Sequence, residues 1–60
     1  MSEYPVGHIK HDPTLNQIAI RTIHDFPSMR WCVATATAGA RNAGDDEVAE
    51  WDDLYTPEPE

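Results

Sequence analysis

Two stretches of this chain alternate in character from one residue to the next, and this alternation constrains the fold more than any other feature. In residues 17–23, QIAIRTI, an extended strand would place Ile18 and Ile20 on one face and Ala19 and Arg21 on the other. Three of these seven residues are isoleucine, a residue that strands favour. The pattern therefore predicts a β-strand, and with it a fold built around a sheet.

A second alternating stretch follows in residues 31–38, WCVATATA. The larger or β-branched residues, beginning with Trp31 and Val33, alternate with small residues that begin with Cys32 and Ala34. A helix is the competing assignment, because four alanines follow one another at every second position from Ala34. Tryptophan, valine and threonine at period two suit a pleated sheet better, so the pattern favours a strand.

Turn-forming residues separate these strands from shorter extended segments. A strand in residues 8–11 is joined to the first alternating stretch by a turn over residues 12–16, which opens with an Asp-Pro pair. Residues 38–44, AGARNAG, predict another turn with a short return strand around residues 40–41. Residues 1–7 contain a proline and a glycine and are expected to be frayed.

The last part of the chain, residues 45–60, holds eight acidic residues and no basic residue. Val48, Trp51 and Tyr55 are spaced so that a helix would bring them to one face. The acids at the start of this segment suit the positive end of a helix dipole, and either of the first two aspartates can cap the helix. The helix should end before Pro57, because a residue before proline disfavours helical geometry.

These assignments predict an α+β fold, namely a three- to four-stranded antiparallel sheet with one short C-terminal amphipathic helix on a face. Residues 1–55 form a single small domain, and residues 56–60 are expected to be a disordered acidic tail. The expected core draws on 14 large apolar residues and is thin, which leaves a chain of this length only marginally stable. These residues are Val6, Ile9, Leu15, Ile18, Ile20, Ile23, Phe26, Met29, Trp31, Val33, Val48, Trp51, Leu54 and Tyr55.

The charge is concentrated at one end of the chain. Residues 1–44 hold three acids and four bases, whereas the whole chain has a formal net charge of −7. A negative surface disfavours nucleic acid and anionic membranes as partners and permits a basic protein. The single cysteine, Cys32, rules out an internal disulfide. No apolar run resembles a signal peptide or reaches the roughly 20 residues of a membrane span, so a cytoplasmic chain is expected.

The combinations of side chains that carry chemistry are sparse. His8, His11 and Asp12 suggest a metal site, with His24 and Cys32 as further ligands, but zinc sites use paired ligands in a tetrahedral set. The flanking residues of Cys32 are those of a packed strand, which indicates a structural thiol rather than a nucleophile. A core this thin is expected to leave no pocket of about 300 Å³ or more. The sequence therefore predicts a protein that is not an enzyme, without cofactor or metal.

The order of these features resembles that of a protein family. The segments GHIKHDP, IAIRT, RWCVAT and EVAEWDDL, in that order, resemble small uncharacterised accessory proteins of viruses that infect actinobacteria. The resemblance covers roughly residues 17–54 and rests on a few apolar residues with loose spacing. It implies an accessory protein that acts in a bacterial cytoplasm, and it implies no catalytic or binding residues.

The leading functional prediction is a non-enzymatic protein that binds and modulates a larger intracellular protein of a bacterial host. Aromatic residues anchor many interfaces, and the expected partner-binding residues are Trp51, Tyr55, Glu47, Glu50, Asp52 and Asp53. Trp51 either packs on the sheet as part of the core or contacts the partner. One alternative is a structural homo-oligomer that assembles through strand edges. Another is an acidic decoy of a nucleic-acid-binding protein, with Asp45 and Asp46 added to the acids already named.

Overall fold

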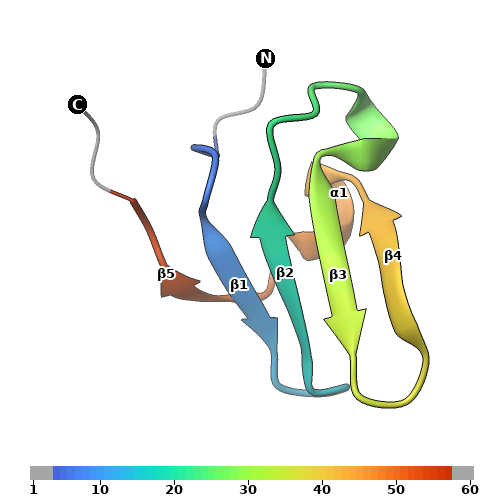
Figure 1. The fold of residues 1–60 in the computed structure, drawn as a ribbon. Coiled ribbons are helices and arrows are strands. Elements are labelled where there is room, and N and C mark those ends of the chain that lie inside the picture. The colour runs from blue at the N-terminus through green and yellow to red at the C-terminus, as the bar shows by residue number, and fades with distance from the viewer. Residues whose placement is uncertain (1–3, 58–60) are drawn as a thin grey trace.

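The computed structural model describes residues 4–57 and consists mainly of one antiparallel sheet of five strands (Figure 1). The elements in chain order are β1 (Ile9–Asp12), β2 (Gln17–Arg21), the 3-10 helix η1 (Pro27–Met29), β3 (Trp31–Thr35), β4 (Gly39–Ala43), α1 (Asp45–Val48) and β5 (Asp52–Tyr55). The order across the sheet is β4-β3-β2-β1-β5. Strands β1 to β4 therefore lie beside their sequence neighbours, and β5 returns to pair with the other edge of β1 (Figure 1).

The two alternating stretches form strands as expected, but β2 ends at Arg21 and β3 at Thr35. The turn expected over residues 38–44 lies at residues 36–38 instead. The second stretch forms β3 and not the competing helix, and the return strand expected around residues 40–41 forms as β4. The turn between β1 and β2 begins as expected, because the Thr14 amide donates a hydrogen bond to Asp12 Oδ1 at 3.0 Å. Gly39, which opens β4, has a φ of +77°, a conformation that favours glycine.

The expected C-terminal amphipathic helix is wrong beyond its first turn. α1 ends at Val48, and residues 52–55 form β5, so the sheet has more than the three to four strands expected. Lys10 Nζ donates hydrogen bonds to the main-chain carbonyls of Ala49 and Trp51, which a continuing helix would have paired with its own amides. A single helical turn is marginal by itself, so pairing with the open edge of β1 decides the conformation of this segment.

The start of α1 also differs from the expected aspartate cap. The N-cap residue is Gly44, and no side chain donates or accepts a capping hydrogen bond. The Asp45 carboxylate instead accepts hydrogen bonds from Trp31 Nε1 at 2.6 Å and from Arg30 Nη1 at 3.1 Å. A Cβ atom on Gly44 would lie 2.9 Å from the Pro27 carbonyl oxygen, so the close approach to η1 requires glycine here.

The apolar core is smaller than the sequence predicts. Its buried members are Ala19, Trp31, Val33, Ala43 and Val48, and the partly buried Tyr4 and Trp51 pack against them. Of the 14 large apolar residues expected in the core, only Trp31, Val33 and Val48 are buried and nine are exposed. The exposed nine are Val6, Leu15, Ile18, Ile20, Ile23, Phe26, Met29, Leu54 and Tyr55.

Polar side chains occupy much of the interior in place of the exposed apolar residues. The buried polar residues are His8, Lys10, Gln17 and Arg21. The Arg21 guanidinium donates hydrogen bonds to the main-chain carbonyls of Thr22 and His24 in the loop after β2. A buried cation is tolerated only when it is paired or hydrogen-bonded, and these loop carbonyls supply the partners.

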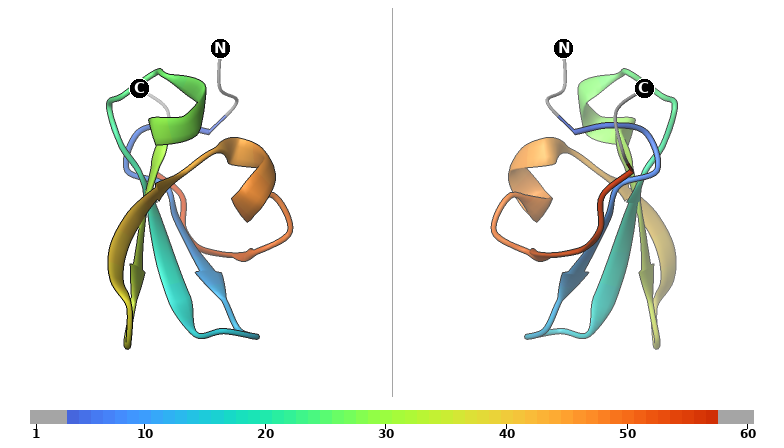
Figure 2. Two further views of the ribbon diagram at one scale, coloured as in Figure 1. Left: turned by 90° about the vertical axis from the view of Figure 1, so that its right-hand side faces the viewer. Right: turned by 90° about the vertical axis from the view of Figure 1, so that its left-hand side faces the viewer.

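The two faces of the sheet are covered unequally. Figure 2 shows the sheet from its edges, with α1 and the connection that follows it on one side. Within residues 4–57, no helix or strand covers the other side (Figure 2). Ala19 and Arg21 of β2 face the covered side, whereas Ile18 and Ile20 are exposed on the other. The alternation in β2 is thus as predicted, but the buried face is the less apolar one.

The structure of the chain ends matches the predictions from the sequence only in part. The expected fraying is wrong from Tyr4 onwards, since the Tyr4 ring packs edge-on against Trp31 with 5.3 Å between ring centroids. The Gly7 amide also donates a hydrogen bond to the Arg21 carbonyl at 2.8 Å. Residues 1–3 of the expected frayed start and residues 58–60 of the expected disordered tail lie outside the described residues. In the part of the chain that is described, no helix has the length and apolar character needed to cross a membrane.

Candidate functional site

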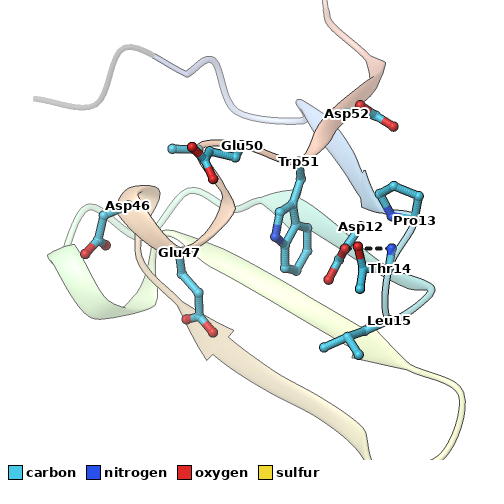
Figure 3. A pocket seen from close by; sticks show the side chains of 10 residues that line it. Asp12, Pro13, Thr14, Leu15, Asp46, Glu47, Glu50, Trp51 and Asp52 are labelled. Atoms are coloured by element: carbon cyan, nitrogen blue, oxygen red, sulfur yellow. Dashed lines mark hydrogen bonds between the residues drawn. The ribbon is translucent and has the colours of Figure 1, made fainter.

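A hollow of about 680 Å³ lies between the β1–β2 turn and the connection from α1 to β5 (Figure 3). Its lining residues are Asp12, Pro13, Thr14, Leu15, Asp46, Glu47, Ala49, Glu50, Trp51 and Asp52. The expectation that this chain has no pocket of such a size is therefore wrong. The reason is the early end of α1, because residues 49–51 form an irregular connection instead of a helix packed on the sheet.

Trp51 forms the centre of this hollow. Its indole projects between Glu47 on one side and Asp12 on the other (Figure 3). The side chain is half-buried and also packs against the apolar core. Of the two roles that the sequence left open for Trp51, packing against the core is present in part, and contact with a partner stays a prediction.

Lys10 holds the segment that carries Trp51. Its side chain is only 4% exposed, and its ammonium donates to the carbonyls of Ala49 at 3.3 Å and Trp51 at 3.2 Å. The same nitrogen lies 3.6 Å from Asp53 Oδ1 and 5.1 Å from the centre of the Tyr4 ring. The buried cation therefore fixes the main chain on both sides of Glu50 and orients the indole. Sequence reasoning missed Lys10, because nothing in residues 8–11 indicates that a lysine points inward.

Asp53 does not line the hollow. His8 Nε2 and Asp53 Oδ1 are 2.8 Å apart, and the His8 ring is buried between Tyr4 and Trp31. The hydrogen bond with His8 is the main cause that lowers the pKa of Asp53, and the charge of Lys10 acts in the same direction. The Asp53 side chain is 62% exposed and pairs with the buried His8 and Lys10 side chains, so its predicted contact with a partner stays a prediction.

This arrangement predicts that acid weakens the fold through Asp53. Its lowered pKa means that the folded chain binds fewer protons than the unfolded chain, whose Asp titrates near 3.8. The contribution is therefore fully present above that value and is lost as pH falls through the lower folded pKa. Urea unfolding between about pH 5 and pH 2 should show less loss of stability for Asp53→Asn than for the unmodified chain. Equal losses in the two proteins would contradict the assignment of Asp53 as the partner of His8 and Lys10.

The walls of the hollow are acidic. Five of its lining residues are carboxylates, and the lining contains no Lys, Arg or His side chain. Asp12 accepts hydrogen bonds from the Gln17 side-chain amide and the Thr14 amide, and the bond from Gln17 is the main cause that lowers its pKa. Glu47 is paired with Arg41 at 2.6 Å. In the described structure no ion pair neutralises the other three, which are Asp46, Glu50 and Asp52.

The structure brings together four of the six residues that the sequence singled out for partner binding. Trp51, Glu47, Glu50 and Asp52 line the hollow, whereas Tyr55 and Asp53 do not. Tyr55 is exposed at the end of β5, opposite Ile9 of β1. The sequence analysis missed Asp12 and Leu15 as wall residues. Both belong to a turn that lies more than 30 residues before Trp51, so only the tertiary fold brings them near.

The histidines and the cysteine do not form a shared site. His8 contacts Asp53, while His11 Nε2 lies 3.1 Å from Asn16 Oδ1. Among the described residues, no group of three or more His, Cys, Asp or Glu side chains is placed to hold a metal ion. Cys32 is exposed in β3, so the packed thiol expected from the sequence is wrong, because the small side of β3 faces away from the core.

The hollow has the chemistry of a site for a cation. Its carboxylates attract positive charge, and the face of an indole attracts a cation electrostatically. No family model, curated protein or solved structure matches this chain. The function is therefore inferred from the chemistry of the hollow.

Proposed function

We propose that this chain is a non-enzymatic protein that binds a basic segment of a larger protein and thereby modulates it. The observation that carries the proposal is the half-buried indole of Trp51 in a hollow with five carboxylates and no base among the lining residues. The volume of about 680 Å³ is ample for one or two long side chains. The resemblance to viral accessory proteins makes an intracellular protein of a bacterial host the partner that we favour.

Arginine fits this hollow better than lysine. A guanidinium is planar and stacks on an indole, and its fork of N–H groups binds a carboxylate through two parallel hydrogen bonds. Trp51 supplies the aromatic surface, and the unpaired Glu50 and Asp52 stand on either side of it in the chain. Lysine offers a compact, strongly hydrated charge, which gains less from a single aromatic ring. The proposed ligand is therefore a segment that presents arginine.

The decoy alternative relied on carboxylates spaced along two to three helical turns. α1 provides only the four residues Asp45–Val48, and Asp45 is engaged with Trp31 and Arg30. The acidic surface is consequently a compact hollow around an aromatic ring and not an extended row of charges. This geometry supports recognition of one or two basic side chains better than mimicry of a nucleic-acid backbone.

A peptide-binding measurement tests the proposal. Fluorescence anisotropy of a labelled tetra-arginine peptide should show saturable binding that is at least about threefold tighter than that of tetra-lysine. Trp51→Leu keeps an apolar side chain against the core but removes the indole, and should weaken arginine binding about three- to tenfold. The double change of Glu50→Gln and Asp52→Asn should weaken it by a similar factor.

Asp25→Asn is the matched control, because it removes the same kind of charge from an exposed loop outside the hollow. It should leave arginine binding within about twofold of the unmodified chain, since surface charges at a distance are screened. Equal weakening by Asp25→Asn and by the hollow variants would show that net charge alone causes binding. Binding that vanishes at high salt and is unchanged in Trp51→Leu would favour the decoy instead.

A further inference from the structure

The strand β5 lies at an edge of the sheet and begins at the hollow. It pairs with β1 alone, and Figure 1 shows no described strand or helix beyond it. Asp52, its first residue, lines the hollow, and Trp51 directly precedes it. Among residues 4–57, no main-chain hydrogen bond of β5 goes to a segment other than β1. The outer side of β5 therefore offers amides and carbonyls to a strand that continues from the hollow.

Contacts on the inner side hold β5 in place. The Asp53 carboxylate lies 2.8 Å from His8 Nε2 and 3.6 Å from Lys10 Nζ, and both of these side chains are buried. Lys10 also donates a hydrogen bond to the Trp51 carbonyl at 3.2 Å. All four β5 residues are nevertheless exposed. β5 is thus formed before a ligand arrives, and a ligand that pairs with it avoids the cost of ordering this strand.

We propose that the basic segment binds as an extended strand, which pairs with the outer edge of β5 and places an arginine against Trp51. This inference rests on the proposed function and specifies the conformation of the ligand. When a peptide adds a strand to a sheet edge, main-chain hydrogen bonds supply affinity and alternate side chains supply specificity. We expect antiparallel pairing, because it is slightly more stable per residue than parallel pairing.

The charges of β5 select the kind of strand that fits. β5 presents Asp52 and Asp53, and cross-strand pairs of opposite charge stabilise a sheet whereas like charges destabilise it. A second copy of β5 is therefore disfavoured by its own acids, and a basic strand is favoured. Leu54 and Tyr55 are 59% and 57% exposed and can contact β-branched residues of the ligand. In antiparallel order, these β-branched residues precede the arginines of the ligand.

The opposite edge of the sheet does not suit the same ligand. β4 carries Arg41, whose charge repels a basic strand, and it contains Gly39 and Asn42, which strands disfavour. No residue of β4 lines the hollow. β5 is consequently the edge at which one segment can contact both the hollow and a free strand.

Peptides with methylated main-chain amides test this inference on the full chain. The parent probe is a fluorescein-labelled peptide of sequence Thr-Val-Thr-Val-Arg-Arg, whose binding is followed by fluorescence anisotropy. In an added edge strand, the amides of alternate residues face the protein and the others face solvent. Methylation of the set that faces β5 should weaken binding at least about tenfold, because several hydrogen bonds are lost together. Methylation of the other set should leave the affinity within about threefold of the parent.

The outcomes distinguish this inference from the proposed function. Equal affinity of the parent and both methylated peptides would overturn strand addition, while binding to the hollow through side chains would stand. Equal weakening by both sets of methyl groups would also overturn strand addition, because one set should face solvent. If the parent peptide does not bind at all, the proposed function fails and this inference fails with it.

A substitution on β5 provides a second test. Leu54→Lys adds a cation to the edge strand outside the hollow and should weaken the parent peptide at least about threefold. Ile23→Lys is the matched control, because it makes the same kind of change at an exposed residue of the loop after β2. It should stay within about twofold of the unmodified chain, since distant surface charges are screened. Equal affinities of the two variants, both folded by circular dichroism, would overturn the inference.

Discussion

A Trp31→Ala variant should be largely unfolded at room temperature. Trp31 is fully buried, and its ring packs edge-on against Tyr4 at 5.3 Å and His8 at 5.7 Å between ring centroids. The substitution removes these contacts and the hydrogen bond from Nε1 to Asp45, at a cost of about 3–5 kcal/mol. A chain with so small a core is stable by only a few kcal/mol. Far-ultraviolet circular dichroism and the dispersion of the proton NMR spectrum measure the loss.

Two other variants make this result specific to Trp31. Trp31→Phe keeps a buried ring but loses the donor to Asp45, so it should remain folded with stability lowered by about 1–2 kcal/mol. Trp51→Ala removes the second tryptophan, which is only half-buried, and should also remain folded. A folded Trp31→Ala chain, or an unfolded Trp51→Ala chain, would show that the core is centred elsewhere.

Lys10→Met should both destabilise the fold and weaken the binding of basic peptides. Methionine fills a similar space, but the carbonyls of Ala49 and Trp51 lose their donor and Asp53 loses a neighbouring cation. We expect stability to fall by about 2 kcal/mol and arginine-peptide affinity by at least about threefold, because the connection that carries Trp51 is no longer fixed. Urea unfolding and fluorescence anisotropy measure the two effects.

Arg41→Met is the control for the charge lost in Lys10→Met. Arg41 is exposed and pairs with Glu47, so its removal should change stability by less than about 1 kcal/mol. It also releases the Glu47 carboxylate in the hollow, so peptide affinity should be equal or higher. Loss of a cation makes the chain more negative, so net charge alone would raise the affinity for a basic peptide in both variants. An affinity of Lys10→Met equal to or higher than that of the unmodified chain would mean that Lys10 does not position Trp51.

Local pattern was sufficient to predict β1 to β4 but not β5. The alternation in β2 and β3 and the Asp-Pro turn before β2 depend on near neighbours in the chain, and all three are present. The identity of the buried face does not depend on near neighbours. Lys10 and Arg21 point inward because carbonyls of distant or looped segments accept their hydrogen bonds. Periodicity alone therefore favoured the isoleucine face, which the structure leaves exposed.

The C-terminal segment shows the same limit more clearly. Val48, Trp51 and Tyr55 have helical spacing, yet the helix stops after Val48. The free edge of β1 and the buried ammonium of Lys10 compete with the helix for the same main-chain groups, and neither is visible in the local sequence. Four of the six candidate residues line the hollow, and they could be selected from the sequence because an aromatic residue among acids is an interface pattern in any conformation. The opposite wall of the hollow, which includes Asp12, could not be predicted from the sequence, because only the tertiary fold brings it near Trp51.

A titration of the isotope-labelled chain with tetra-arginine peptide, followed by NMR, tests the central claim most directly. If the acidic hollow binds basic segments, the largest shifts should occur at the indole Nε1–H of Trp51 and at the amides of residues 12–15 and 46–52. The amides of Ile18, Ile20 and Cys32, on the side of the sheet away from α1, should move least. Shifts that are largest on that side of the sheet, or absent throughout at saturating peptide, would contradict the claim.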